Sequence, residues 1–195
     1  MKLLAALVHA AAAAASQVEV DRLAVVFDSL APLDTGDKGS PISRGQSVAV
    51  QFPIPCSTAG LTLEYVNFTL GTLDIPDDGS LWLHAELCTS ANGLPHCTNS
   101  DAVGVPIETI AKRVTLQTIP PYPFVLDPAT TYWFTLHTNG KTKNKSPIWL
   151  DGRETFSTKN DPKNKVLVAY SEGDTWAVAA PTEDRFVPSL QVYAS

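Results

Sequence analysis

The stretch LWLHAEL, residues 81–87, alternates aliphatic side chains with side chains that can do chemistry. In an extended strand Trp82, His84 and Glu86 project from the same face, because successive side chains point to opposite sides. An aromatic ring offers a flat apolar surface, and imidazole and carboxylate groups bind hydroxyls. This combination suits a pyranose ring, so the stretch predicts part of a carbohydrate-binding platform.

A second stretch, TYWFTLHT at residues 131–138, extends this candidate platform. Trp133 and His137 share one face of the predicted strand, whereas Tyr132, Phe134 and Leu136 share the other. The candidate ligand-binding set is therefore Trp82, His84, Glu86, Trp133 and His137. The alternative interpretation is a second packed layer over the same rings, which is the commoner arrangement because exposed Trp side chains are unusual without a partner.

Metal binding has weaker support in the residue pattern. His84, Glu86, His96 and His137 are possible ligands, but only His84 and Glu86 have a spacing that places them on one strand face. We therefore predict no metal centre. The acidic loop DIPDDGS offers carboxylates that suit calcium, namely Asp74, Asp77 and Asp78. An ordinary acidic turn is the preferred interpretation, so no cofactor is expected and calcium stays the open alternative.

The chain has three cysteines, Cys56, Cys88 and Cys97. The segment CTSANGLPHC contains Asn-Gly and Pro, and this turn-rich composition predicts a disulfide between Cys88 and Cys97 in an oxidising compartment. Cys56 is then either a buried thiol or an intermolecular link.

No catalytic signature is present in the sequence. The segment SEGDTW, Ser171–Trp176, is similar to the Asp-box hairpins of sialidase-like propellers, but it occurs once and its acidic residue is displaced. We predict a tight hairpin with Gly173 at positive φ. The chain also contains no Gly-x-Ser-x-Gly elbow, P-loop or dinucleotide fingerprint. A non-catalytic protein is expected, although a glycoside-cleaving pair of carboxylates is defined by spatial distance and stays open.

The first 16 residues predict a signal peptide, since Lys2 precedes an apolar run that is too short to span a bilayer. An Ala-rich helix is the alternative. Residues 17–195 are then one domain, with no predicted transmembrane segment. The expected localisation is secreted, and the sequons at Asn67 and Asn144 would be glycosylation sites in a eukaryotic secretory route.

The charge distribution bears on possible partners. The formal net charge is −6, from 14 Lys and Arg against 20 Asp and Glu, which argues against nucleic acid. Seven cations nevertheless gather in one region, at Lys141, Lys143, Lys145, Arg153, Lys159, Lys163 and Lys165. These are solvated loop lysines or a basic strip for an anionic glycan or membrane surface. The expected partner is an extracellular glycan or protein, and the oligomeric state is open.

About ten short β-rich runs separated by turn residues predict a single antiparallel β-sandwich of jelly-roll type. Val66, Phe68 and Leu70 are predicted to face the core, as are Leu83 and Leu87. Leu61 and Leu63 break the alternation of their strand. We therefore expect the start of that strand to be covered on both faces.

The order of these features resembles the R type of the choice-of-anchor domains, which are secreted β-sandwich modules. The resemblance covers residues 48–192 as an ordered pattern, and its closest phrase is FVLDPATTYWFTL, Phe124–Leu136. It implies an extracellular or surface module without catalytic residues. No anchor follows the domain in this sequence, which predicts free secretion or non-covalent retention in a wall or matrix.

These observations together predict a secreted, non-catalytic β-sandwich with a structural or adhesive role in an extracellular layer. A carbohydrate-binding module is the first alternative, and a glycan-active hydrolase is the second.

Overall fold

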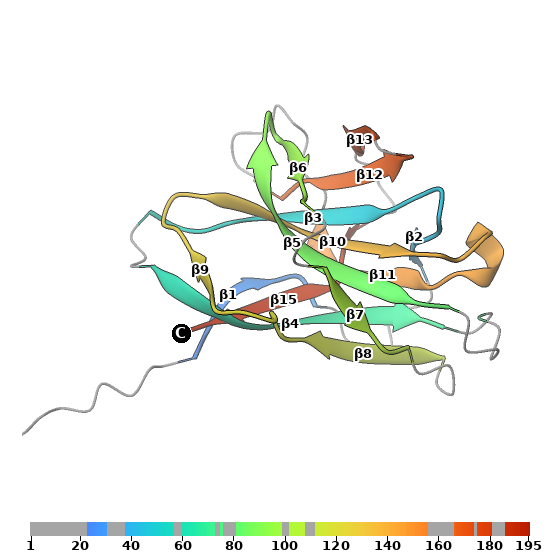
Figure 1. The fold of residues 1–195 in the computed structure, drawn as a ribbon, viewed down its shortest axis with the longest axis horizontal. Coiled ribbons are helices and arrows are strands. Elements are labelled where there is room, and N and C mark those ends of the chain that lie inside the picture. The colour runs from blue at the N-terminus through green and yellow to red at the C-terminus, as the bar shows by residue number, and fades with distance from the viewer. Residues whose placement is uncertain are drawn as a thin grey trace, which may run out of the picture.

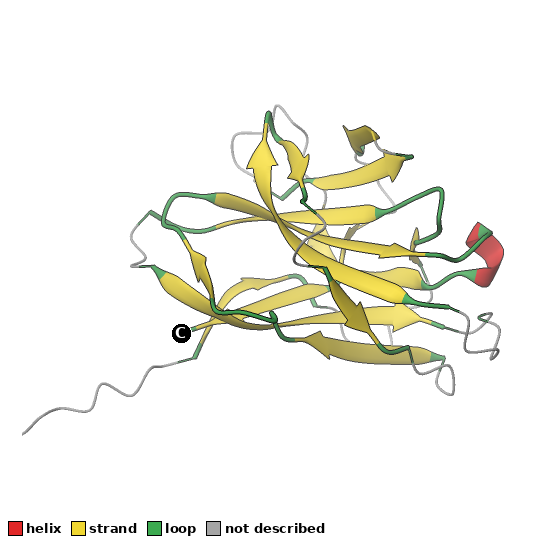
Figure 2. Ribbon diagram, in the orientation of Figure 1, coloured by secondary structure: helices red, strands yellow, loops and turns green. Residues whose placement is uncertain are grey.

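A computed structural model describes residues 23–30, 38–56, 60–72, 75, 81–98, 102–107, 112–155, 166–173, 175–180 and 186–195. These residues form 15 strands and one short 3-10 helix, η1 (Lys143–Lys145). The strands make two antiparallel sheets stacked on each other (Figures 1 and 2). The predicted all-β sandwich is confirmed. The strand number exceeds the expected ten because five three-residue strands lie where the composition predicts loops or turns.

The first sheet has eight strands and is centred on β4 (Leu61–Gly71). Its order is β1 (Ala24–Asp28), β15 (Leu190–Ala194), β4, β11 (Ile148–Thr155) and β14 (Phe186–Pro188). Three shorter strands complete it: β2 (Gly39–Pro41) beside β11, and β8 (Arg113–Thr118) and β9 (Phe124–Leu126) beside β4. The first and last strands of the described chain are therefore paired with each other.

The second sheet has seven strands and carries the residues of the candidate site. Its order is β13 (Thr175–Val178), β12 (Val168–Glu172), β3 (Val48–Pro53), β10 (Thr131–Thr138), β5 (Leu83–Ala91) and β6 (Leu94–His96), with β7 (Val103–Val105) also beside β5. The edge strands β13 and β6 contact each other, so the sheet curls almost into a barrel (Figure 1). Its outer face, which points away from the first sheet, is consequently concave.

The core between the sheets is aromatic and aliphatic. Phe68 of β4 lies 5.6 Å from Phe134 of β10 between ring centroids, and Trp149 of β11 contacts both rings. The predicted inward faces are confirmed for the buried residues Val66, Phe68, Leu70, Leu83, Ala85, Tyr132, Phe134 and Leu136. Burial of such side chains stabilises the fold by about 1.5–3 kcal/mol each.

The irregular start of β4 has a different cause from the one expected. Tyr65 pairs with Tyr193 and Leu63 pairs with Ala194, so Glu64 is an extra residue in the ladder. Such a β-bulge changes which face the following residues occupy. Leu63 and Val66 therefore both face the core, and the bulge accounts for the break in alternation.

Several predicted features lie outside the described residues. These are the signal peptide at residues 1–16, the acidic loop residues Asp74, Asp77 and Asp78, and the lysines Lys159, Lys163 and Lys165. The side chain of Asn144 is likewise outside them, whereas Asn67 faces away from the core and accepts a hydrogen bond from Gln117 Nε2 at 3.4 Å. Among the described residues no helix has the length and apolar character needed to cross a membrane.

Candidate functional site

The concave outer face of the seven-stranded sheet holds a cavity of about 760 Å³. Its floor comes from β5 and β10, one wall from β6 and the residues after it, and the other wall from the β12–β13 hairpin. An adjoining cavity of about 480 Å³ shares Arg44, Ser47 and His137 with the first. We call the two together the outer groove. The first is lined by Arg44, Ser47, His84, Glu86, Pro95, His96, Cys97, Ala102, Thr135, His137, Ser171, Gly173 and Trp176; the second adds Ser43, Trp82, Thr138, Asn139 and Lys141.

Four of the five predicted ligand-binding residues line this groove, and the rings of three of them cluster together. His84 of β5 stands directly opposite His137 of β10 in the antiparallel ladder, and their ring centroids are 5.2 Å apart. The Trp82 ring lies 4.3 Å from His84 and 5.6 Å from His137. These three rings form the aromatic cluster of the groove.

The Trp82 ring is held at the surface by its backbone. The Trp82 N–H donates to Asn139 Oδ1 at 3.0 Å, and its carbonyl accepts a hydrogen bond from the Thr138 hydroxyl. Both partners lie at the end of β10, so the residue before β5 is tied to the neighbouring strand. The residue is 42 % exposed, so part of it is accessible to a ligand.

His137 has an unusual electrostatic position. Burial lowers the pKa of its imidazole below the ordinary value, and the neighbouring His84 lowers the pKa further. Its Nε2 atom is buried and has no hydrogen-bond partner among the described residues. The ring is therefore neutral at neutral pH and keeps unused hydrogen-bonding capacity at the groove floor.

Glu86 does not extend the aromatic cluster as expected. It is 3 % exposed, and its Oε1 accepts a hydrogen bond from the Thr98 N–H at 3.0 Å. Its backbone carbonyl accepts a second bond from the Thr135 hydroxyl at 3.2 Å. The carboxylate thus holds the segment after β6 in place, so its role at the groove is to position a wall.

The expectation that Trp133 belongs to the platform is wrong, because this side chain is fully buried. It packs with Ala49, Cys88 and Ala169 on the outer face, and Trp176 packs against the same cluster. Its Nε1 donates to Ser90 Oγ at 3.3 Å. The alternative of a packed second layer is therefore correct at this position.

The predicted hairpin at residues 171–176 is confirmed, with Glu172 paired to Thr175 and Gly173 at a φ of 64°. It places the half-buried Trp176 over the Trp133 cluster and along the groove wall. The ligand-binding set from the sequence omits Trp176, and it also omits Arg44 and Lys141. Arg44 lies in a tight turn and Lys141 in a loop, where no strand period marks their orientation.

The predicted disulfide is confirmed, with the Cys88 and Cys97 sulfurs 2.03 Å apart. The turn between β5 and β6 has Asn92 and Gly93 at φ values of 54° and 75°, as a two-residue hairpin requires. The disulfide thus joins the groove floor to its wall. Glu86 and the two sulfurs lie within 4.8 Å of one another, but bonded sulfurs have no thiolate to offer a metal.

Two further expectations concern metal ligands and the third cysteine. Within the described part of the chain, His84, Glu86, His96 and His137 do not bring three ligand atoms within 4.8 Å. Cys56 is a free, exposed thiol. The expectation of a buried thiol is therefore wrong, and the intermolecular link stays a prediction.

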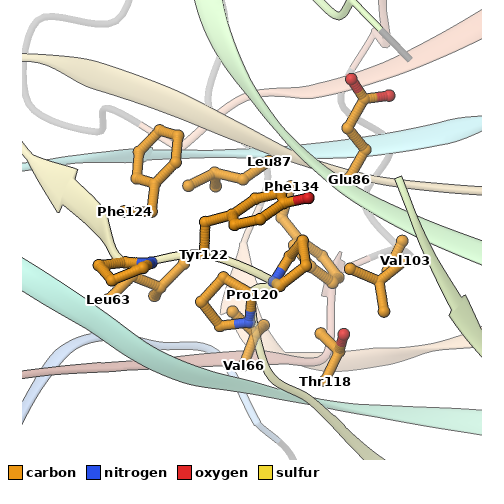
Figure 3. Close-up of a pocket in the computed structure, with 13 residues that line it drawn as sticks. Leu63, Val66, Glu86, Leu87, Val103, Thr118, Pro120, Tyr122, Phe124 and Phe134 are labelled. Atoms are coloured by element: carbon orange, nitrogen blue, oxygen red, sulfur yellow. The ribbon is translucent and has the colours of Figure 1, made fainter. Parts of the chain in front are cut away.

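Another cavity, of about 220 Å³, lies between the sheets near the connection from β8 to β9 (Figure 3). Its wall is mainly apolar, with Leu63, Val66 and Phe134 inside and Tyr122 on a Pro-rich rim. The Glu86 carboxylate is directed away from it (Figure 3), toward its partner Thr98. A polar ligand would lose its hydrogen bonds to water here with little replacement. The outer groove is therefore the candidate site for a polar ligand.

The sequence matches no known protein-family model, and no curated protein matches it significantly.

Proposed function

We propose that this protein is a non-catalytic extracellular module that adheres to a polysaccharide by binding the sugar chain in the outer groove. The observation that carries this proposal is the exposed Trp82 ring, which stands beside His84 and His137 at the edge of a groove lined with polar groups. A pyranose has apolar faces and a rim of hydroxyls. It is matched by an aromatic face surrounded by hydrogen-bonding side chains.

The dimensions of the groove support a ligand with several units. Each of its two adjoining cavities, about 760 and 480 Å³, falls in the range typical of small-molecule sites. Trp82 lines the smaller one and Trp176 lines the larger one. Hydroxyl and amide groups of Ser47, Thr135 and Asn139 lie along the lining. A chain that passes through both cavities would contact aromatic rings and hydrogen-bonding groups in turn.

The groove is built on rigid elements. Its floor consists of paired strands, and the disulfide and the Glu86 carboxylate hold one wall. A preformed site loses little conformational entropy when it binds a ligand, which favours affinity. This preformed groove is consistent with binding of a polysaccharide without a conformational change of the protein.

The lining residues support binding over hydrolysis. Canonical glycoside hydrolysis uses two carboxyl groups on either side of the scissile bond. Among the described residues that line the groove, Glu86 is the one carboxylate, and it is buried and hydrogen-bonded to the protein backbone. The hydrolase alternative therefore has less support than a binding role.

An extracellular setting is part of the proposal. The disulfide is typical of oxidising compartments. The predicted signal peptide and the resemblance to choice-of-anchor domains also support an extracellular location. The phrase that carries the resemblance forms β9, a turn and β10, and the Tyr132 hydroxyl accepts a hydrogen bond from the Asp127 N–H at 2.9 Å across this turn.

The test is a Trp82→Ala substitution in residues 17–195, assayed by pull-down on insoluble polysaccharides and by affinity electrophoresis in soluble ones. We expect the wild type to be retained and the variant to bind roughly tenfold more weakly, because the stacking surface is lost. The melting temperature should change little, since the ring is 42 % exposed.

Tyr122→Ala is the matched control, because Tyr122 is a 71 % exposed aromatic residue that does not line the outer groove. It should bind like the wild type. Unchanged retention of Trp82→Ala would contradict the proposal. Absence of retention on every polysaccharide would also contradict it, and would favour a structural role or a protein partner.

A further inference from the structure

We infer that the outer groove selects anionic polysaccharides, with carboxylate or sulfate groups on their sugars, over neutral ones. This inference rests on the proposed function and specifies its ligand class. It starts from the charges on the lining. Arg44 and Lys141 supply permanent positive charge, and both are exposed. Glu86 is the one carboxylate among the described lining residues, and its Oε1 already accepts a hydrogen bond from Thr98.

This positive lining contrasts with the molecule as a whole. The chain has a formal net charge of −6, so a groove with accessible cations and no accessible carboxylate among its described residues is not a consequence of average composition. Three histidines, His84, His96 and His137, add further N–H groups along the same lining. An anionic ligand would meet hydrogen-bond donors and positive charge there without a repelling carboxylate.

Backbone hydrogen bonds hold the segments that carry the two cations, of which Arg44 lines both cavities and Lys141 lines the smaller one. The turn that carries Arg44 is closed by two reciprocal hydrogen bonds between Ser43 and Gln46, each 2.9 Å long. The Arg44 N–H also donates to the Gly140 carbonyl at 2.8 Å, which places Arg44 next to the loop that carries Lys141. A guanidinium binds a carboxylate or sulfate through two parallel hydrogen bonds, and the ammonium adds a second charge.

The exposed lysines that follow Lys141 in the chain indicate that the ligand is a polymer. Lys141 leads directly into η1, where Lys143 and Lys145 are also exposed. A chain that leaves the groove past Trp82 and Lys141 would meet these charges next. A carbohydrate fits better than a nucleic acid, because the overall charge is negative and the lining has few permanent cations.

The experiment compares polymers that share a backbone and differ in their charged groups: dextran with dextran sulfate, and methyl-esterified polygalacturonate with polygalacturonate. Binding is measured by affinity electrophoresis and calorimetry in EDTA, so that calcium bridging does not contribute. We expect the wild type to bind at least one anionic polymer about tenfold or more tightly than its neutral partner. This preference should shrink as salt is raised, because exposed charges are screened.

The variant Arg44→Gln/Lys141→Gln should lose most of the preference, so that the ratio of its affinities for the anionic and the neutral polymer falls about tenfold. The control Lys38→Gln/Lys112→Gln removes the same charge from two exposed positions that do not line the groove, and should behave like the wild type. A response to the sulfated polymer alone, or to the uronate alone, supports the inference and identifies the recognised group.

Several outcomes would overturn the inference. Equal affinity for charged and neutral polymers would refute it while leaving the proposed function intact, whereas retention on no polysaccharide would refute both. An equal loss in the control double variant would show a general charge effect rather than recognition in the groove. Binding of a single-stranded oligonucleotide as tightly as the anionic polysaccharide would show that the groove accepts polyanions of any kind.

Discussion

At the scale of single residues, similar side chains on the outer face of the seven-stranded sheet differ in how far they are exposed. Trp82, directly before β5, and Trp133 of the neighbouring β10 project from the same face, yet Trp82 is 42 % exposed and Trp133 is fully buried. Glu86 and His84 also share a face, but Glu86 is engaged by the backbone at Thr98. The groups that a ligand can contact in the groove therefore depend on what packs over each side chain. The aromatic cluster of Trp82, His84 and His137 is left uncovered.

Protonation of His137 links this cluster to the stability of the folded state. Its pKa is lowered in the folded state from the ordinary 6.5, by burial first and by His84 second, so the unfolded chain binds a proton more readily than the folded chain. Stability therefore rises with pH between the lowered folded pKa and 6.5, and the loss on acidification is complete below the folded pKa.

We expect His137→Gln to reduce this acid sensitivity. The difference between urea midpoints at about pH 8 and about pH 5 should be smaller in the variant than in the wild type. His96→Gln, on the exposed wall, tests whether the loss of any histidine has the same effect. An unchanged pH difference in His137→Gln would show that His137 does not contribute to acid sensitivity.

At the scale of elements, the groove depends on the pairing of β5 with β6. The hairpin turn at Asn92 and Gly93 sets the register, and the disulfide from Cys88 to Cys97 closes the pair beyond the last hydrogen-bonded residues. Pro95 and His96 line the groove from this hairpin. The wall position is therefore covalently tied to the floor.

The double substitution Cys88→Ala/Cys97→Ala should lower the free energy of unfolding by about 2–3 kcal/mol, as expected for a loop with a sequence separation of 9. It should also weaken polysaccharide binding, because the β6 wall is less constrained. The measurement is urea denaturation together with affinity electrophoresis. Cys56→Ala is the control and should change neither, since that thiol is exposed and unbonded. Full stability in the double variant would mean that the ladder alone holds the wall.

At the scale of the whole molecule, the first sheet joins segments from both ends of the described chain. The Ser29 hydroxyl donates to the Pro188 carbonyl and accepts from the Leu190 N–H, each at 2.9 Å. Gly152 of β11 lies against this junction, and a Cβ there would be 1.8 Å from the Ser29 carbonyl oxygen. The junction leaves no space for a side chain at position 152.

We therefore expect Gly152→Ala to destabilise the fold by about 3 kcal/mol, since the backbone of two strands must shift. Gly45→Ala is the matched control, because a Cβ at Gly45 would meet nothing within 4 Å. Thermal and urea unfolding of both variants give the comparison. A Gly152→Ala protein as stable as the control would show that the junction yields at little cost.

The features that depend on neighbouring residues could be predicted from local sequence patterns. Alternation of side chains predicted the core faces of β5 and β10, and turn chemistry predicted the hairpin at Gly173. The Cys88–Cys97 pairing followed from short spacing. These features depend on residues close in sequence, so a local pattern is sufficient to specify them. The bulge at Glu64 was missed, because it appears locally only as a break in alternation.

The accessibility of side chains on the outer face depends on contacts between segments that are distant in sequence, so local patterns could not predict it. Curling of the sheet brings β13 against β6 and covers Trp133 with Trp176, whereas Trp82 lies beyond this cover. The Arg44 N–H bonds to the Gly140 carbonyl, which is distant in sequence, and this brings Arg44 next to the loop that carries Lys141. A strand period gives the direction of a side chain but not what packs over it, because coverage comes from segments that meet only when the sheet closes.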